Sequence, residues 1–121
     1  MVRFWITLLK RLRTPEHEDN RRVLWAVTLQ SREYVFIVWK QTADLGNHYH
    51  NYTEQWTLLW GQAKARFRQP EQSGCDEYKL RLGSAVTIVP GMAHVIRGDA
   101  GCVLLIRRPA GQYSATALNV W

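Results

Sequence analysis

The chain has 121 residues, of which 46% are hydrophobic, and a formal net charge of +6 at pH 7. This length suffices for one buried core but not for two, so we predict a single domain over residues 1–121. No apolar run approaches the roughly 20 residues of a membrane span. The basic residues are scattered and accompany no nucleic-acid-binding motif. We therefore predict neither a membrane nor a nucleic acid partner, and the cations form either a solvated surface or a site for a small anion.

Cys75 and Cys102 lie far apart in the sequence and have neither metal-binding nor redox spacing. Such cysteines are typical of reduced thiols in a cytoplasmic protein. The apolar residues 4–9 are flanked by Lys and Arg but lack a small-residue cleavage site, so we do not interpret them as a signal peptide. We therefore expect a cytoplasmic protein.

The first half of the chain predicts one ambiguous segment and a β-hairpin. Apolar residues within 2–9 recur at spacings that fit a helix and a strand equally well. Residues 22–29 and 34–40 are rich in β-branched and aromatic residues, and the polar residues 30–33 between them predict a turn. Residues 44–47 predict a second turn, which leads into the strand that follows.

The next two predicted strands surround a glycine. Residues 55–60 form the first strand, and Gly61-Gln62 predicts a tight hairpin turn because glycine readily adopts positive φ. Residues 63–68 alternate small or apolar residues with cations, which is typical of a sheet with one buried and one solvated face.

The remaining pattern completes an all-β fold. Short apolar or alternating strands are predicted at residues 78–82, 86–89, 94–96 and 102–106. About eight short strands, regular turns and no convincing long helix indicate a sandwich or barrel.

Four potential metal ligands follow the parity of a strand. His48 and His50 are two residues apart and can share one face, Glu54 keeps their parity, and His94 follows the turn at Pro90. Each histidine taken alone is more often an ordinary polar residue. Together they predict a site for a divalent transition metal such as Fe, Mn, Zn or Ni, since a mixed nitrogen and oxygen set disfavours calcium and magnesium.

The run His48-x-His50-x3-Glu54-x6-Gly61 resembles the first signature motif of the cupin superfamily. The resemblance extends over roughly residues 40–107. It implies an all-β double-stranded β-helix, that is, a jelly-roll barrel whose mouth holds a metal.

Gly83-x6-Pro90-Gly91-x2-His94 is similar to the second cupin motif, although it is slightly contracted and lacks the usual later Asn. Transferred position by position, the resemblance implies a ligand set. Those ligands are His48, His50, Glu54 and His94.

Strand parity also predicts the walls of the pocket. Trp56, Leu58 and Trp60 share the parity of Glu54, while Met92 and Ile96 share that of His94. Core packing explains Leu58, Trp60 and Ile96 at least as well. We predict a set of substrate-binding residues from nearness to the ligands and from charge: Trp56, Met92, Arg66 and Arg97. We predict that the catalytic groups are Glu54, His50 and Tyr52.

Three functions remain open. The first is a metal-dependent isomerase, lyase or dioxygenase that acts on a small, oxygen-rich anion, with Glu54 or a tyrosine moving a proton. The second is a metal-free nucleotide-sugar epimerase or ketoisomerase with a histidine base. Residues 46–50 and the predicted hairpin at residues 61–64 resemble small cupins of nucleotide-sugar and polysaccharide biosynthesis. The third is a non-enzymatic ligand-binding cupin.

A homodimer is the expected assembly. The apolar, tryptophan-containing segments 4–9 and 118–121 need a place to bury, and a small barrel leaves sheet edges exposed.

Overall fold

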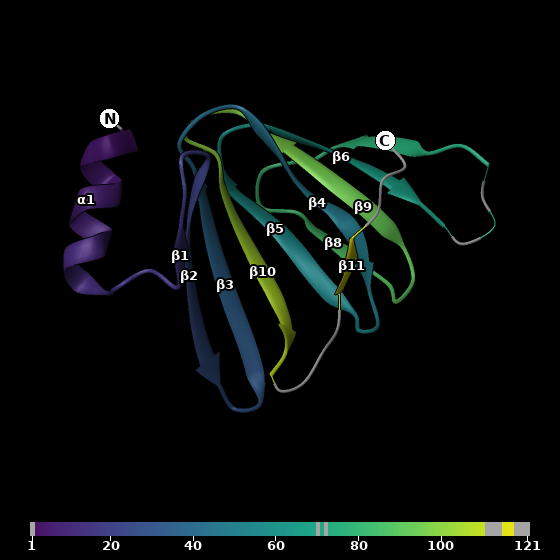
Figure 1. Cartoon of the computed structure of the whole chain (residues 1–121), viewed down its shortest axis with the longest axis horizontal. Coiled ribbons are helices and arrows are strands. Elements are labelled where there is room, and N and C mark those ends of the chain that lie inside the picture. The colour runs from purple at the N-terminus through teal and green to yellow at the C-terminus, as the bar shows by residue number, and fades with distance from the viewer. Residues whose placement is uncertain (1, 70, 72, 111–114, 118–121) are drawn as a thin grey trace.

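Two antiparallel β-sheets face each other, and one helix lies outside them (Figure 1). The computed structural model describes residues 2–69, 71, 73–110 and 115–117. Side chains are described for these residues except 2, 47–49 and 115–117.

The first sheet has six strands in the order β1-β2-β3-β10-β5-β8. These strands are β1 (His17–Glu18), β2 (Arg22–Leu29), β3 (Arg32–Trp39), β10 (Val103–Pro109), β5 (Glu54–Trp60) and β8 (Ala85–Ile88). The predicted β2–β3 hairpin is confirmed, and Gln30 and Ser31 in its turn have positive φ, as a two-residue hairpin connection requires.

The second sheet has five described strands in the order β11-β4-β9-β6-β7. They are β11 (Ala115–Ala117), β4 (Ala43–His50), β9 (Ala93–Gly98), β6 (Ala63–Arg68) and β7 (Asp76–Lys79). Neighbours such as β3 and β10, or β4 and β9, are distant in the sequence. The chain therefore winds back and forth between the sheets, and the all-β jelly-roll prediction is confirmed.

The core lies between the inner faces of the two sheets. Trp39, Leu58 and Leu104 are almost completely buried there. In β6 buried alanines alternate with exposed cations, which confirms the predicted buried and solvated faces. Gly98 in β9 packs beneath Trp39, whose ring would come within 2.6 Å of a Cβ at that position.

A β-bulge in β4 replaces the turn that the sequence predicts at residues 44–47. Leu45 pairs with Ile96 and His48 pairs with His94, so three steps along β4 match two steps along β9. Gly46 lies in the bulge and has φ +104°, a conformation that glycine adopts readily. The chain bulges here instead of turning. Odd-numbered residues of β4 therefore point to the core before the bulge, and the even-numbered His50 points to the core after it.

The predicted hairpin at Gly61 is wrong. β5 pairs with β10 and β8, whereas β6 pairs with β9 and β7, so Gly61 carries the chain from one sheet to the other. Its φ of +87° agrees with the conformational reason for a glycine there.

The ambiguous N-terminal segment is a helix, α1 (Val2–Leu12), and not a strand. It has no Gly or Pro, and Lys10 and Arg11 in its last turn suit the negative end of the helix dipole. Ile6 is the contact with the outer face of the six-stranded sheet, beside Val23, Trp25 and Val38. No helix in the described part of the chain is both long and apolar enough to cross a membrane.

We predict that Gly61→Ala lowers the stability by about 1–3 kcal/mol. The alanine Cβ would lie 2.8 Å from Cys102 Cα, at a φ that L-residues rarely adopt. Gly74→Ala is the matched control because nothing lies within 4 Å of a Cβ there. Chemical denaturation measures both variants, and equal losses would contradict the role of Gly61.

We predict that acid weakens the attachment of α1. Lys10 donates a hydrogen bond to Glu18 over 2.6 Å, and Lys40 forms an ion pair with the same carboxylate. These cations lower the pKa of Glu18 from its ordinary 4.5, so the stabilisation exists above that pH and disappears as the pH falls through the folded-state value. Hydrogen-exchange protection factors of α1 should therefore fall below about pH 4.

Glu18→Gln should lower the protection of α1 at neutral pH and remove much of its acid dependence. Glu16→Gln is the control, since no ion pair of Glu16 is present among the described residues. Equal acid dependence in wild type and Glu18→Gln would show that another group attaches the helix.

Candidate metal centre

Three polar side chains converge inside an otherwise apolar core. His50 from β4 and Glu54 from β5 are each 3% exposed, and His94 from β9 is 1% exposed. One ligand atom from each residue lies within 4.8 Å of the other two. The structure thus brings together three of the four predicted ligands from both sheets.

The fourth predicted ligand, His48, can be placed only through its backbone. It pairs with His94 in the register of β4 and β9, but its side chain lies outside the described residues.

Glu54 is a buried carboxyl group with one satisfied oxygen. Trp56 Nε1 donates a hydrogen bond to Oε1 over 2.7 Å, and His50 Nε2 lies 3.5 Å from the same oxygen. Oε2 is buried and has no hydrogen-bond partner within the described part of the chain. Burial raises the pKa of Glu54, while the Trp56 hydrogen bond and the charge of Arg108 partly oppose that rise.

His94 is held with one defined nitrogen toward the cluster. Its Nδ1 lies 3.1 Å from the carbonyl oxygen of Met92. A carbonyl only accepts, so Nδ1 carries the proton and Nε2 of the neutral ring keeps the lone pair that a metal requires. The Trp56 ring packs edge-on against the His94 ring, with centroids 5.1 Å apart, which further fixes its orientation.

The corner predicted at Pro90-Gly91 positions β9 against β4. The Gly91 amide donates a 2.9 Å hydrogen bond to the carbonyl oxygen of His50, and Gly91 has φ +81°. The ring centroids of His50 and His94 lie 4.5 Å apart as a result of this arrangement. A glycine is thus needed where the corner approaches the ligand strand.

The residues present fit a divalent transition metal. Two imidazoles and a carboxylate form the mixed nitrogen and oxygen set that Fe, Mn, Zn and Ni accept. The buried Glu54 Oε2 supplies an acceptor that a cation would satisfy. The cluster could therefore hold a metal, although its donor atoms do not select one of the four.

Other predicted site residues lie close to the cluster. Tyr52 stacks on the His50 ring with centroids 4.4 Å apart and an interplanar angle of 19°. Trp56 is buried between Glu54 and His94, and Met92 packs against the core as a partly buried side chain.

Arg66 and Arg97 are placed away from the cluster, which corrects the expectation that they flank the pocket. Both alternate with buried residues, so they lie on the solvated face of the five-stranded sheet. There Arg97 donates a 3.1 Å hydrogen bond to Asp44, and Arg66 lies 3.8 Å from Glu77. Each of these two positive charges is therefore paired with an acidic residue at the surface.

Trp60 is also corrected, because it is 68% exposed. The pairing of β5 with β10 shifts between Leu104, opposite Leu58, and Val103, opposite Trp60. This bulge turns Trp60 to the outer face. Leu58 and Ile96 are buried in the core, in agreement with plain core packing.

Arg108 is a residue that the sequence analysis missed. It follows the buried Leu104 and the core-packed Ile106 at strand parity, so it lies on the inner face of β10. Arg108 Nη2 donates a 2.6 Å hydrogen bond to Glu33, and its charge partly opposes the rise that burial causes in the pKa of Glu54. The sequence predicts that this strand ends at residue 106, whereas β10 continues to Pro109, and strand parity over the longer range is the signal that places Arg108 on the inner face.

Comparisons with known proteins identify the fold. No family profile and no curated protein matches the sequence. Among solved structures, the capsular polysaccharide assembling protein CapF from Staphylococcus aureus is 21% identical over 86% of this chain and 34% of its own, with a TM-score of 0.73.

Two further solved structures show the same likeness. Lactobacillus farciminis oxalate decarboxylase in a formate complex is 19% identical over 84% of this chain and 32% of its own, with a TM-score of 0.71. The 11S allergen from Cocos nucifera L. is 11% identical over 85% and 32%, with a TM-score of 0.73. The chain therefore spans about a third of the length of these proteins.

At these identities the likeness establishes the fold. The protein has the cupin jelly-roll fold, which confirms the fold that the sequence resemblance implied. Its particular feature is a buried His50–Glu54–His94 cluster that could bind a metal.

We predict that the purified protein contains a divalent transition metal and that His94→Ala loses most of it. His17→Ala is the matched control, since this histidine is exposed and pairs with Asp19 outside the site. Trp56→Phe keeps an aromatic ring but removes the donor to Glu54, and should weaken metal affinity about 10–100-fold. Elemental analysis and metal titration measure these changes. Equal metal content in His94→Ala and His17→Ala would exclude the assigned centre.

Proposed function

We propose that the protein is a metal-dependent cupin enzyme that acts on a small, oxygen-rich anionic molecule. The observation that carries this proposal is the buried Glu54 carboxyl group, which converges with two imidazoles and has one oxygen without a described partner. Burying a carboxyl group in an apolar interior is unfavourable because the group loses its hydration, so packing alone does not explain why Glu54 is there. A bound divalent cation would compensate that cost.

In this proposal His50, Glu54 and His94 hold the metal, with His48 as the fourth ligand from the cupin resemblance. The metal, when bound, supplies Lewis-acid polarisation of a carbonyl or of two adjacent oxygens. Tyr52, packed on the His50 ring, holds or moves a proton at its phenolic oxygen. Trp56 keeps the Glu54 carboxylate oriented through its N–H and excludes water from that side.

Charge and shape limit the substrate. Met92 and Trp56 offer an apolar wall, and Arg108 provides positive charge on the inner face near Glu54. Isomerase, lyase and dioxygenase reactions of a hydroxy-acid, keto-acid or sugar derivative all fit a metal with two adjacent substrate oxygens.

The neighbours support this chemistry without establishing it. One CapF structure contains the inhibitor 3-isopropenyl-tropolone, and one oxalate decarboxylase structure contains formate. Tropolones present two adjacent oxygens on a ring, and formate presents a carboxylate. Both features are those expected of a ligand for the proposed site.

A metal-free sugar epimerase or ketoisomerase is the second candidate. The stacking of Tyr52 on His50 favours it, because it brings a phenol next to a potential general base. In that reaction His50 would remove a proton adjacent to a keto group and Tyr52 would return one. It leaves the convergence of Glu54 and His94 on His50 without a catalytic role.

We predict that tropolone and small dicarboxylates raise the melting temperature of the metal-loaded protein more than that of the metal-stripped protein. A ligand at about a hundred times its dissociation constant should add roughly 2.7 kcal/mol of stability. Differential scanning fluorimetry with and without prior chelation measures the effect, and a cationic diamine of similar size is the control ligand. Equal stabilisation of both forms would favour the metal-free reaction instead.

A further inference from the structure

Helix α1 carries more apolar surface than the sheet covers. Ile6 is buried, but Phe4, Leu8 and Leu12 are 65%, 38% and 76% exposed. These three residues are four positions apart, so they form one stripe along the helix. Trp5 beside the stripe is 55% exposed as well. The helix is therefore apolar on a face that the described part of the chain leaves open.

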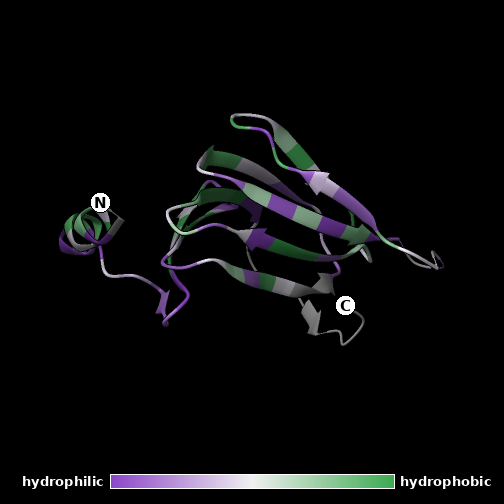
Figure 2. Cartoon of the chain, turned by 90° about the horizontal axis from the view of Figure 1, so that it is seen from above, coloured by the Kyte–Doolittle hydropathy of each residue, from purple (hydrophilic) through white to green (hydrophobic). Residues whose placement is uncertain are grey.

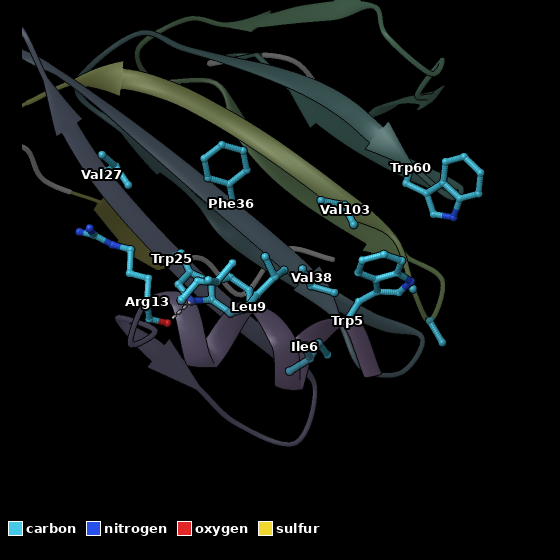
Figure 3. Close-up of a pocket in the computed structure, with 13 residues that line it drawn as sticks. Trp5, Ile6, Leu9, Arg13, Trp25, Val27, Phe36, Val38, Trp60 and Val103 are labelled. Atoms are coloured by element: carbon cyan, nitrogen blue, oxygen red, sulfur yellow. Dashed lines mark hydrogen bonds between the residues drawn. The ribbon is translucent and has the colours of Figure 1, made fainter. Parts of the chain in front are cut away.

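The apolar surface continues into a groove between α1 and the outer face of the six-stranded sheet. Figure 3 shows this groove, which has a volume of about 850 Å³. Trp5 and Leu9 line it from the helix, while Trp25, Phe36 and Trp60 line it from the sheet. The helix does not seal against the sheet, so apolar surface is accessible on two flanks of α1.

Every charged residue within residues 1–15 is basic, and the acidic residues Glu16, Glu18 and Asp19 follow directly. Residues 1–15 contain Arg3, Lys10, Arg11 and Arg13 and no acidic residue. Lys10 is paired with Glu18, whereas Arg3 and Arg11 are exposed and form no ion pair with any residue that the structure describes. An anionic partner complements such a face.

We propose that α1 docks the protein on an anionic lipid bilayer. An amphipathic helix with Trp, Phe and Leu on one face and cations beside it binds in the plane of the membrane interface. Phe4, Leu8 and Leu12 enter the interface, and Arg3 and Arg11 contact lipid phosphates. The proposal departs from our expectation that the protein has no membrane partner, which rested on the lack of a spanning segment. An interfacial helix needs no such segment.

The position of α1 allows this docking. In two perpendicular views the helix lies at one end of the molecule, outside the two sheets (Figures 1 and 2). The metal cluster lies between the sheets, on strands β4, β5 and β9. Docking through α1 therefore does not involve the metal ligands.

A second copy of the chain is the other possible occupant, as in the predicted homodimer. A two-fold interface through α1 would pair this surface with itself. Arg3 and Arg11 would then face cations of the partner helix with no acidic residue from α1 to compensate them. Charge complementarity thus favours the bilayer over a second copy.

Vesicle flotation of the metal-loaded chain of 121 residues tests the proposal. The probes are vesicles of phosphatidylcholine alone and of phosphatidylcholine with about one quarter phosphatidylglycerol, at low and at physiological salt. We expect binding to the anionic vesicles, weaker binding at higher salt and little binding to the neutral vesicles. Equal binding to both compositions, or none to either, would overturn the proposal.

Paired variants locate the docking face. Leu8→Gln/Leu12→Gln should weaken binding at least tenfold, because two leucines no longer enter the apolar layer. Arg3→Gln/Arg11→Gln should weaken it about thirtyfold, since each cation near an anionic surface contributes about fivefold. The control is Leu29→Gln/Leu82→Gln, which changes two comparably exposed leucines outside α1.

Glutamine keeps a high helix propensity, and circular dichroism and metal content verify that each variant is folded. Equal loss of binding in the control and in the α1 variants would overturn the assignment of the face. Light scattering tests the second occupant. A dimer that Leu8→Gln/Leu12→Gln dissociates, in a protein that does not bind vesicles, would assign the face to a second copy and refute the lipid proposal.

Discussion

The burial of one carboxyl group constrains much of this structure. Glu54 begins β5 and points into the core, where an uncompensated charge would cost several kcal/mol. Its surroundings reduce that cost through an indole N–H from Trp56 and through imidazoles from two strands of the opposite sheet. The two sheets must therefore meet in one register at this point. Apolar packing elsewhere in the core could tolerate small shifts, whereas this cluster could not.

The six-stranded sheet separates two environments. Its inner face presents Glu54 and Arg108 to the core, and its outer face presents Phe36 and Val38 to helix α1. Because side chains alternate along a strand, the same strands serve both faces without sharing side chains. A change on one face reaches the other only through the backbone. The proposed metal centre and the proposed docking face can therefore vary independently within one small domain.

Much of the fold followed from the sequence because strand parity is a local property. The β2–β3 hairpin and the alternation in β6 depend on which residues share a face of one strand. The convergence of His50, Glu54 and His94 is different, because His50 and Glu54 lie on strands of opposite sheets, and the cupin resemblance was what implied it. The pairing of strands is not local. Gly61 joins strands of different sheets, although the same residues would suit a tight hairpin.

Bulges and surface pairs limited the prediction of the site. The register shift in β5 turned Trp60 outward, and no composition signal marks it. Arg66 and Arg97 were assigned to the pocket from charge alone, yet acidic residues on neighbouring strands hold them at the surface. Arg108 was overlooked because the predicted strand ends at residue 106, whereas β10 continues to Pro109. A side chain's direction depends on every irregularity before it in the strand.

The bulge at Gly46 also determines which kinds of sequence change the site can survive. Leu45 and His50 both reach the core only because the bulge changes parity between them. A substitution in this stretch alters one side chain, but the loss or gain of one codon would move every later residue of β4 to the opposite face. The spacing between Leu45 and His50 is thus under stronger physical constraint than the identity of the residues between them. Relatives that retain the centre should therefore align through this stretch without gaps, even where their residues differ.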